Sequence, residues 1–248
     1  MRAKSIDINS LVRENVAKLK PYSSARDEFT DFDEGMVFLD ANENPFKNDL
    51  NRYPDPYQNK LKKNFSDLKN IPLENILLGN GSDEVLDLIF RAFCEPKEDN
   101  IITMPPTYGM YKVLSEINDI ENNEVLLNSD YQIDVDNVLT IVDKNSKLIF
   151  ICSPNNPTGN LMAEVSIKRI LENFAGLVVI DEAYIDFAEA RSWIDEIENY
   201  PNLIVTQTMS KAFGMAGIRM GICYANAEII QVLNKIKPPY NVNQLTQE

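Results

Sequence analysis

The chain has 248 residues, and its 44% hydrophobic and 25% charged residues are typical of globular proteins rather than disordered or fibrous ones. Its 24 basic and 38 acidic residues give a formal charge of −14, which disfavours non-specific binding to nucleic acid or an anionic membrane surface. Histidine is absent, which excludes Ser-His-Asp and Cys-His catalysis and His-ligated metal sites and leaves Lys, Tyr, Asp, Glu and Cys for proton transfer.

The first forty residues are predicted to form an arm, with a short amphipathic helix around residues 8–19 and a turn at Pro21. A loop with prolines at positions 45, 54 and 56 follows, because neither a helix nor a central strand tolerates that spacing. Beyond it, amphipathic stretches predict helices at residues 57–68, 82–93, 108–116, 163–174 and 228–235. Short apolar runs predict strands at residues 76–78, 101–103, 124–127, 148–152, 177–180, 203–206 and 217–223.

Several of these runs, such as 148–151 and 177–180, are continuously apolar rather than alternating. This is typical of strands covered on both faces. We therefore predict an α/β fold of three layers, with a mostly parallel sheet and helices on both of its faces. In such folds, ligands bind beyond the carboxyl ends of the strands.

The three cysteines, Cys94, Cys152 and Cys223, are far apart and form no CxxC pair. We expect them to be small buried hydrophobes in a reducing compartment, and we predict no metal site. No secretory signal is recognisable, and no apolar stretch approaches the ~20 residues that span a bilayer. The sequence therefore predicts a cytoplasmic protein without nucleic-acid or membrane partners.

Polar residues follow the predicted strands at the edge where ligands would bind. Asp181 comes directly after one strand, where it could meet a ligand or cap a helix. Residues 153–159, Ser-Pro-Asn-Asn-Pro-Thr-Gly, form either a rigid functional turn or a plain loop. Lys211 stands among small and hydroxylated residues without an acidic neighbour in sequence. Ser82 begins a helix whose first amides could hold an anion, or it could cap that helix without a ligand.

Together these turns supply a carboxylate, an amide, a phenol, an amine and an anion-binding helix start. Without histidine, Lys211 is the obvious nucleophile, acting through a Schiff base. An aldehyde cofactor that carries a phosphate and a ring nitrogen would use every one of these groups. Pyridoxal 5′-phosphate (PLP) is such a cofactor.

Four spaced elements occur in order: Asn-Pro-Thr-Gly at 156–159, Asp181 with Tyr184, Ser-Lys at 210–211, and Arg219. In these elements the chain resembles the fold-type I PLP-dependent aminotransferases. Residues 20–26, 39–45, 52–56 and 105–111 resemble more closely the histidinol-phosphate aminotransferases within that family. The resemblance covers about residues 19–239.

The resemblance implies a catalytic role for Lys211, which would bind the cofactor as a Schiff base and then move a proton, and for Asp181 and Tyr184. Asp181 would keep the pyridine nitrogen protonated. Tyr184 and Asn156 would hydrogen-bond the ring 3-oxygen, and Tyr108 would stack on the ring.

The resemblance also implies a phosphate site at a helix start, where backbone amides of residues 81 and 82 would bind the anion. The implied phosphate-site residues are Gly81, Ser82, Asp83, Thr208, Ser210 and Arg219. Tyr53 would reach the phosphate of a neighbouring subunit, which implies a homodimer with shared sites. Tyr22 and Asn42 would lie on the substrate side.

The implied reaction is ping-pong transamination between L-histidinol phosphate and 2-oxoglutarate in histidine biosynthesis. We expect residues 41–248 to form the PLP-binding large domain and residues 1–40 to be an arm that contributes to the small domain and the dimer contact. The C-terminal part of that small domain is expected to be absent from this chain. The alternatives are an aromatic aminotransferase, a phospho-amino-acid decarboxylase, or a fragment that binds PLP without activity.

Overall fold

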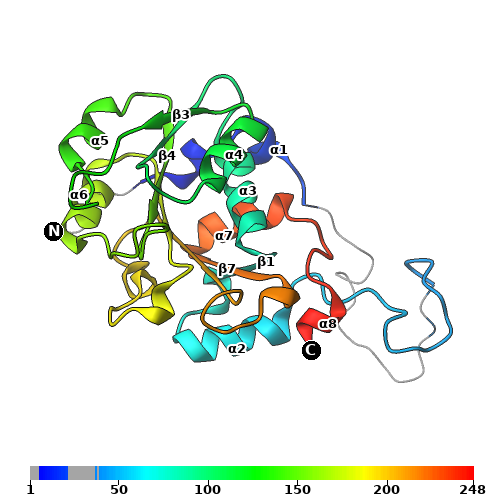
Figure 1. Cartoon of the computed structure of the whole chain (residues 1–248). Helices are drawn as coiled ribbons and strands as arrows, with labels where there is room; N and C mark the ends of the chain where they lie inside the picture. The colour runs from blue at the N-terminus through cyan, green and yellow to red at the C-terminus, as the bar shows by residue number, and fades with distance from the viewer. Residues whose placement is uncertain (1–5, 22–36, 38) are drawn as a thin grey trace.

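The computed structural model describes residues 6–21, 37 and 39–248. Within this part of the chain, seven strands form one sheet in the order β1-β7-β6-β5-β4-β2-β3 (Figure 1). Strand β7 is antiparallel to both of its neighbours, and all other neighbouring pairs are parallel. The strands are β1 Ile76–Asn80, β2 Asn100–Thr103, β3 Glu121–Glu124, β4 Ser146–Cys152, β5 Leu177–Asp181, β6 Leu203–Thr208 and β7 Met220–Ala225.

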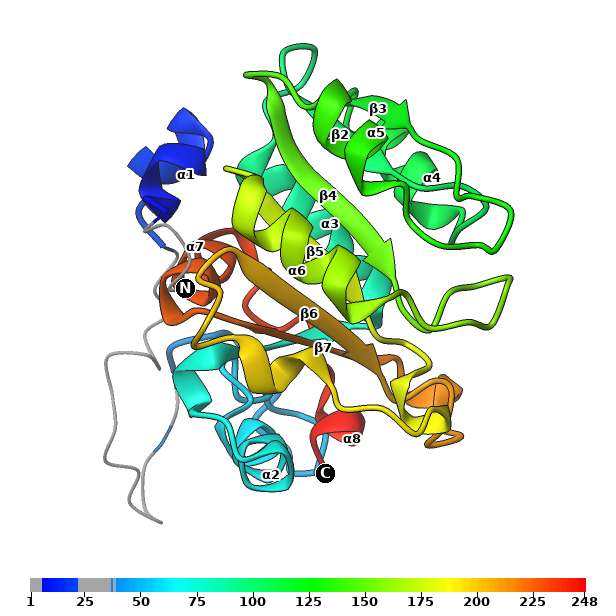
Figure 2. The ribbon, with the colours of Figure 1, turned by 90° about the vertical axis from the view of Figure 1, so that its left-hand side faces the viewer.

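Helices cover both faces of this sheet, so the predicted α/β class and mostly parallel sheet are confirmed. Figure 2 shows α6 in front of the central strands and α3 behind them. The α-helices are α1 Glu14–Lys18, α2 Asn59–Lys69, α3 Ser82–Phe93, α4 Met110–Ile117, α5 Val135–Ile141, α6 Glu164–Asn173, α7 Ala227–Ile236 and α8 Gln244–Gln247. Short 3₁₀ turns lie at Ile8–Leu11, Leu73–Asn75, Ile185–Phe187, Trp193–Glu196 and Ala216–Ile218.

Strand β4 shows why the central strands are apolar along their whole length. Its residues Leu148, Phe150 and Cys152 belong to a core cluster with α3, α4 and α7. Ile149 and Ile151 belong to the opposite cluster, with α5 and α6. Because successive side chains of a strand point to opposite faces, a strand covered on both sides needs an apolar residue at every position.

Two strand predictions were wrong in their bounds. The predicted strand at 124–127 lies instead at Glu121–Glu124, a polar edge strand that pairs only with β2. The apolar residues Val125 and Leu127 follow it and are buried in the core, and their amides donate to Thr103 O and Pro105 O at 3.0 and 2.8 Å. Strand β7 begins at Met220 rather than at residue 217, because a 3₁₀ turn occupies Ala216–Ile218.

The N-terminal segment was predicted to form one helix around residues 8–19, and the structure differs from this prediction. It forms a 3₁₀ turn and the short helix α1, and Ile8 and Val16 are buried against the α3 and α7 side of the sheet. The sequence did not predict this packing. Its predicted contribution to a small domain and a dimer contact stays a prediction. Helix α5 was also missed, although Asp134 caps it by accepting from Asn137 N at 3.2 Å.

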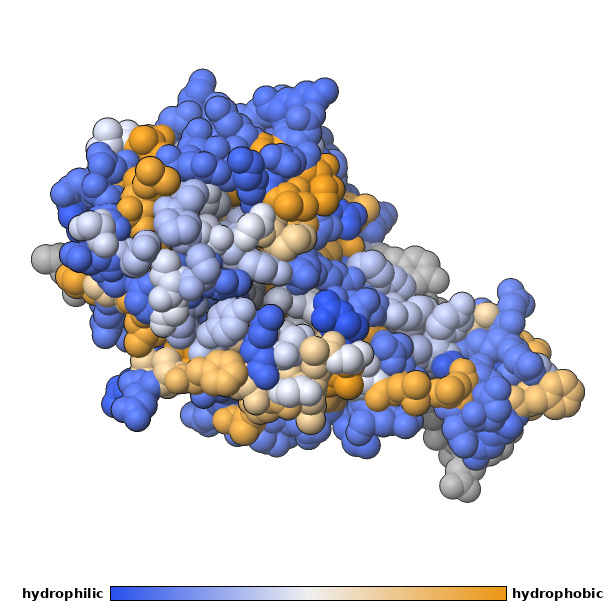
Figure 3. Space-filling view, in the orientation of Figure 1, coloured by the Kyte–Doolittle hydropathy of each residue, from blue (hydrophilic) through white to orange (hydrophobic). Residues whose placement is uncertain are grey.

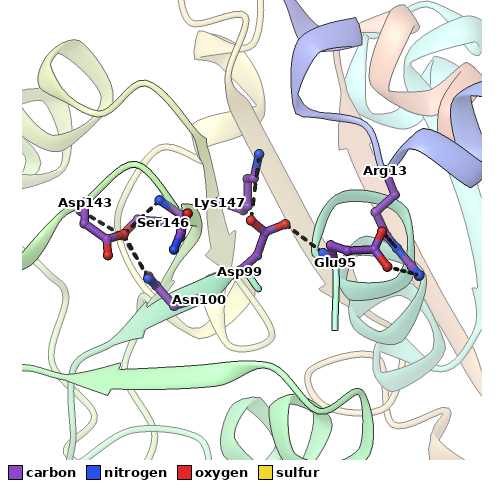
Figure 4. A network of polar contacts seen from close by, with 8 residues as sticks. Arg13, Glu95, Asp99, Asn100, Asp143, Ser146 and Lys147 are labelled. Atoms are coloured by element: carbon purple, nitrogen blue, oxygen red, sulfur yellow. Dashed lines mark hydrogen bonds and ion pairs between the residues drawn. The ribbon is translucent and has the colours of Figure 1, made fainter. Parts of the chain in front are cut away.

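The amino ends of β2 and β4 carry a group of paired polar residues (Figure 4). Arg13 donates from Nε and Nη2 to the two oxygens of Glu95 at 3.1 and 3.2 Å. Asn100 donates to Asp143 at 2.9 Å and accepts from Ser146 Oγ at 2.8 Å. We call this group the amino-end cluster, and its members are Arg13, Glu95, Asp99, Asn100, Asp143, Ser146 and Lys147.

In the described ranges, no helix combines the length and the apolarity that crossing a bilayer would require. All three cysteines are buried and free, as predicted.

Candidate active site

A pocket of about 520 Å³, counting its mouth open to solvent, lies at the carboxyl ends of β4, β5 and β6. It brings together all the predicted cofactor-binding residues except Gly81 and Tyr53. The lining residues are Ser82, Asp83, Tyr108, Cys152, Asn156, Asp181, Ala183, Tyr184, Thr208, Ser210, Lys211 and Arg219. These residues are far apart in sequence but close in space, because parallel strands end at the same edge of the sheet.

Asp181 is a buried acid at the base of this pocket. It is the last residue of β5 and is 3% exposed. Its Oδ2 accepts from the Tyr111 hydroxyl at 2.8 Å, and its Oδ1 accepts from Ala183 N at 3.0 Å. Burial raises the pKa of Asp181, and the hydrogen bond from Tyr111 counteracts that rise. No basic side chain of the described residues forms an ion pair with it. The carboxylate is therefore held by hydrogen bonds and lacks a countercharge.

Lys211 lies in the loop that follows β6. Met209 N donates to Met220 O at 3.1 Å, and Gly214 N donates to Lys211 O at 2.9 Å, so backbone bonds hold the loop. Its Nζ lies 5.5 Å from the centre of the Tyr184 ring. In the described part of the chain, this Nζ makes no hydrogen bond or ion pair. The amine is thus presented to the pocket without an acidic partner.

The start of α3 differs in two ways from its predicted role. Ser82 is the first helical residue and not the cap; the cap is Gly81, at φ +82°. The Gly81 amide donates to Gly79 O and Arg219 O at 2.9 and 2.8 Å, so it is not directed at an anion. A Cβ on Gly81 would lie 2.6 Å from Arg219 Nη2, which shows that this glycine makes room for the guanidinium. The first-turn amides from Ser82 onward have no acceptor within the helix and remain for an anion.

Arg219 supplies a cation at the same helix start. It ends the Ala216–Ile218 turn in the left-handed conformation, at φ +55°, and its guanidinium lies against Gly81. No acidic side chain of the described residues pairs with it. Thr208 Oγ1 accepts from Ser210 N at 3.1 Å, which turns the chain beside this arginine. Helix start, hydroxyls and arginine together form a site suited to a phosphate.

Tyr108 is fixed at the pocket by its hydroxyl and its ring. The hydroxyl donates to Asp83 Oδ1 at 3.1 Å, and the ring meets Tyr111 edge-on with centroids 5.6 Å apart. Burial and the neighbouring Asp83 raise the pKa of Tyr108, so the phenol stays neutral. Asp83 therefore orients the aromatic side chain that was predicted to stack on the cofactor.

Besides Gly81, the predicted residues Tyr53 and Asn42 do not line the pocket. Tyr53 is 49% exposed and stacks on Tyr240 with ring centroids 4.4 Å apart. Asn42 is exposed at φ +53° in the segment between residues 39 and 56, which Figure 1 shows projecting from the body of the molecule. Tyr22 lies outside the described residues.

Three residues of the site were not predicted from the sequence. Ala183 contributes through its backbone amide, and a backbone contact cannot be recognised from the type of residue in the sequence. Cys152 ends β4, and burial raises the pKa of its thiol to about 12, so it is a neutral wall of the pocket. Tyr111 lies three residues after Tyr108, and this helical spacing is the one signal that could have pointed to it.

Exposed apolar side chains occur in the segments that carry pocket residues. Phe187, Phe213, Met215 and Ile218 are exposed, and they lie in the segments that carry Tyr184, Lys211 and Arg219. Figure 3 shows apolar residues gathered along the lower part of the face in view, between hydrophilic ones.

The donor set fits PLP. Among the described residues, no cation pairs with the buried Asp181 carboxylate, and a protonated ring nitrogen would supply one. No anionic side chain of these residues pairs with Arg219, and a phosphate would supply an anion. Lys211 offers the amine that an aldehyde requires.

A mostly parallel sheet with this lysine, buried aspartate and anion site at its carboxyl edge is the arrangement of a PLP-dependent enzyme of the aminotransferase fold. A family model described as aminotransferase class I and II matches residues 37–248. The chain belongs to this family, in the branch of the histidinol-phosphate aminotransferases.

The relatives that place it there are close. The chain is 64% identical over 245 residues to the histidinol-phosphate aminotransferase of Flavobacterium johnsoniae, with 98% of this chain and 70% of the relative covered. It is 65% identical over 245 residues to that of Christiangramia forsetii, with 99% and 70% covered. The chain therefore spans about 70% of the length of these curated relatives.

Solved structures share the fold. The histidinol-phosphate aminotransferase from Clostridium acetobutylicum is 27% identical with a TM-score of 0.71, over 80% of this chain and 59% of that one. The enzyme from Sinorhizobium meliloti in complex with PLP has a TM-score of 0.74 at 24% identity, over 80% and 55%, and shows the fold alone.

Proposed function

We propose that this chain supplies the cofactor site for PLP-dependent transamination between L-histidinol phosphate and 2-oxoglutarate, a step of histidine biosynthesis. The observation that carries the proposal is the convergence of Lys211, Asp181 and Arg219 on one pocket of a chain 64% identical to a histidinol-phosphate aminotransferase. When bound, PLP supplies an aldehyde that reacts with amines and a ring that accepts electrons.

Lys211 is the proposed nucleophile and proton carrier. Its Nζ would be the amine that binds the cofactor aldehyde, and the same amine, when free, would remove the proton from the substrate Cα. An amine without an ion pair among the described residues is suited to both tasks, because no such pair has to be broken first.

Asp181, Tyr184 and Asn156 are proposed to orient and polarise the ring. The Asp181 carboxylate would hold a proton on the ring nitrogen, which would strengthen the electron sink. Tyr184 and Asn156 would hydrogen-bond the 3-oxygen, and Tyr108, which donates to Asp83, would cover one ring face. The start of α3, with Ser82, Asp83, Thr208, Ser210 and Arg219, is proposed to bind the phosphate.

We also propose a cytoplasmic homodimer with shared sites. The segment between residues 39 and 56 projects from the body of the molecule, and neither Tyr53 nor Asn42 lines the pocket of its own chain, which suits contact with a second copy (Figure 1). Glu43 braces this segment by pairing with Arg52 at 2.8 Å and accepting from Tyr53 N at 2.5 Å. In this arrangement Tyr53 reaches the partner's phosphate, and Asn42 and Tyr22 lie on the substrate side.

The exposed apolar side chains of Phe187, Phe213, Met215 and Ile218 also suit a covered surface. In domain terms, residues 41–248 form the proposed large domain, and residues 1–40 form an arm that serves the small domain and the dimer contact.

The cofactor site is tested by incubating the chain with PLP, reducing with borohydride and mapping the modified peptide by mass spectrometry. We expect a pyridoxyl group on Lys211. The buried Lys237, whose pKa burial lowers to about 8, is the internal control for non-specific reaction of a reactive amine. Modification of Lys237 instead of Lys211, or of neither, would contradict the assignment.

The substrate is tested by comparing amino donors in single-turnover reactions. Histidinol phosphate should react markedly faster than phenylalanine, with L-glutamate as the second donor. A preference for phenylalanine would favour an aromatic aminotransferase, and release of carbon dioxide from a phosphorylated amino acid would favour a decarboxylase.

A further inference from the structure

The buried Tyr111 carries a polar hydroxyl in the site, and the proposed mechanism assigns it no role. It comes from α4 and is 0% exposed, and its hydroxyl donates to Asp181 Oδ2 at 2.8 Å. The two residues are 70 positions apart in sequence, so the contact is made only by the fold.

The ring of Tyr111 is fixed on two sides. It stacks on Phe150 with centroids 5.0 Å apart and an angle of 22°, and it meets the Tyr108 ring edge-on at 5.6 Å and 86°. A ring packed in this way holds its hydroxyl in one direction. With Oδ2 bound by Tyr111 and Oδ1 bound by Ala183 N, the plane of the Asp181 carboxylate is fixed.

A phenol suits this position better than a basic side chain would. A neutral donor stabilises a carboxylate by a charge-assisted hydrogen bond but does not cancel its charge, so the charge stays available for a cationic ligand. Burial and Asp181 itself raise the pKa of Tyr111 well above its usual value, so the hydroxyl keeps its proton and remains a donor.

We propose that Tyr111 is a positioning residue that keeps the Asp181 carboxylate ionised and in one orientation for the ring nitrogen of PLP. This inference depends on the proposed cofactor site. It assigns Tyr111 a task that differs from that of Tyr108, which lies just before α4 and is proposed to cover the ring face.

Tyr224, on strand β7, offers a matched control. It is as buried as Tyr111, but its hydroxyl has no hydrogen-bond partner among the described residues. Tyr224→Phe therefore removes a buried hydroxyl without removing a hydrogen bond, whereas Tyr111→Phe removes a hydroxyl together with its bond to a charged group.

The first measurement is the dissociation constant for PLP. We expect Tyr111→Phe to raise it by about ten- to a hundredfold, as for loss of a hydrogen bond to a charged group, and Tyr224→Phe to leave it within about twofold. In an Asp181→Asn background, the effect of Tyr111→Phe should largely vanish, because the two residues act as one unit.

The second measurement is the pH dependence of PLP affinity. The bond from Tyr111 lowers the pKa of Asp181, so its removal raises that pKa, and the loss of affinity on acidification should begin about one pH unit higher in Tyr111→Phe. The other titratable groups near Asp181 are Cys152, Asp83, Tyr108, Tyr184, Lys211 and Arg219, and they are the same in parent and variant.

Equal dissociation constants and equal pH profiles for Tyr111→Phe and Tyr224→Phe would overturn the inference, as would an undiminished effect in the Asp181→Asn background. If the parent forms the Lys211 adduct but Tyr111→Phe behaves like the control, only this inference fails. If the parent takes up no PLP, the proposed function fails with it. Thermal unfolding of each variant without PLP identifies any loss of fold.

Discussion

The two ends of the sheet carry similar polar residues in opposite states of pairing. In the amino-end cluster, Arg13 is paired with Glu95, and Lys147 lies 4.0 Å from Asp99 (Figure 4). In the carboxyl-end pocket, neither Lys211 nor Arg219 has an acidic partner among the described residues, and Asp181 has no basic one. An arginine, a lysine and an aspartate are present at both ends.

The comparison teaches that pairing, and not residue type, separates the two roles. A charge paired within the protein contributes to stability, and its removal leaves a partner unsatisfied. A charge that faces a pocket unpaired contributes little to stability and is available to a ligand. Substitutions of charged pocket residues should therefore change function with little change in stability. Substitutions of charged residues in the amino-end cluster should lower stability with little change in function.

The largest expected effect belongs to Lys211→Ala. We expect transamination to fall by at least about 10⁴-fold, because both the covalent anchor and the proton carrier are lost. The free energy of unfolding should change by less than about 0.5 kcal/mol, because the side chain is exposed and makes no hydrogen bond within the described residues. Turnover assays and urea denaturation measure the two quantities.

Lys147→Ala is the matched control for this variant. Lys147 faces Asp99 at the other end of the sheet, so its loss should lower stability slightly and leave turnover unchanged. Activity that survives in Lys211→Ala would show that the site has been assigned to the wrong lysine.

Asp181→Asn should slow proton removal from the substrate by about 10²- to 10³-fold while PLP still binds. Asparagine keeps an oxygen that can accept from Tyr111 or Ala183 but carries no charge to hold a proton on the ring nitrogen. The protein without PLP should lose little stability, because a buried carboxylate without a countercharge is removed. A single-turnover reaction with L-glutamate measures the effect, and an unchanged rate would refute the role.

Arg219→Ala should weaken PLP binding by about ten- to a hundredfold, since a charge-assisted hydrogen bond to the phosphate is lost. The PLP affinity of Arg219→Lys should lie between those of the parent and Arg219→Ala, because lysine keeps the positive charge but not the planar set of donors of arginine. Pyridoxal, which has no phosphate, provides the control and should bind parent and variant with similar affinity. An equal loss for PLP and pyridoxal would mean that Arg219 supports the ring side of the site.

Much of this fold and site could be predicted from the sequence because the information is local. The apolar runs at 148–152 and 177–180 predict buried strands, and the turns that follow them must share one edge of a parallel sheet. Asn156 and Asp181 could therefore be expected together from the sequence, and Lys211 with them, because it follows the strand predicted at 203–206. Edge strand β3 was misplaced because a strand with one neighbour and little burial carries no apolar signal.

What could not be predicted depends on contacts between distant segments. The Tyr111 hydroxyl reaches Asp181, at the end of strand β5, from helix α4, and no spacing rule connects residues 70 positions apart. The Gly81 amide donates to Arg219 O, so the residue predicted to bind the anion instead makes room for the arginine that faces it. In both cases the sequence could not predict the hydrogen-bond partner of a side chain or an amide, because that partner is determined by tertiary packing.

The smallest expected effect, and the one that tests the amino end, belongs to Arg13→Met. Arg13 is 16% exposed and donates to Glu95 twice and to Arg91 O at 3.0 Å. Its replacement should lower the free energy of unfolding by about 1–2 kcal/mol and leave the PLP dissociation constant unchanged. Lys63→Met is the control, because the Lys63–Asp67 pair is exposed on α2 and should contribute only about 0.3–0.5 kcal/mol. Equal losses of stability in both variants, or weaker PLP binding by Arg13→Met, would contradict the idea that paired charges stabilise the fold while unpaired charges bind ligands.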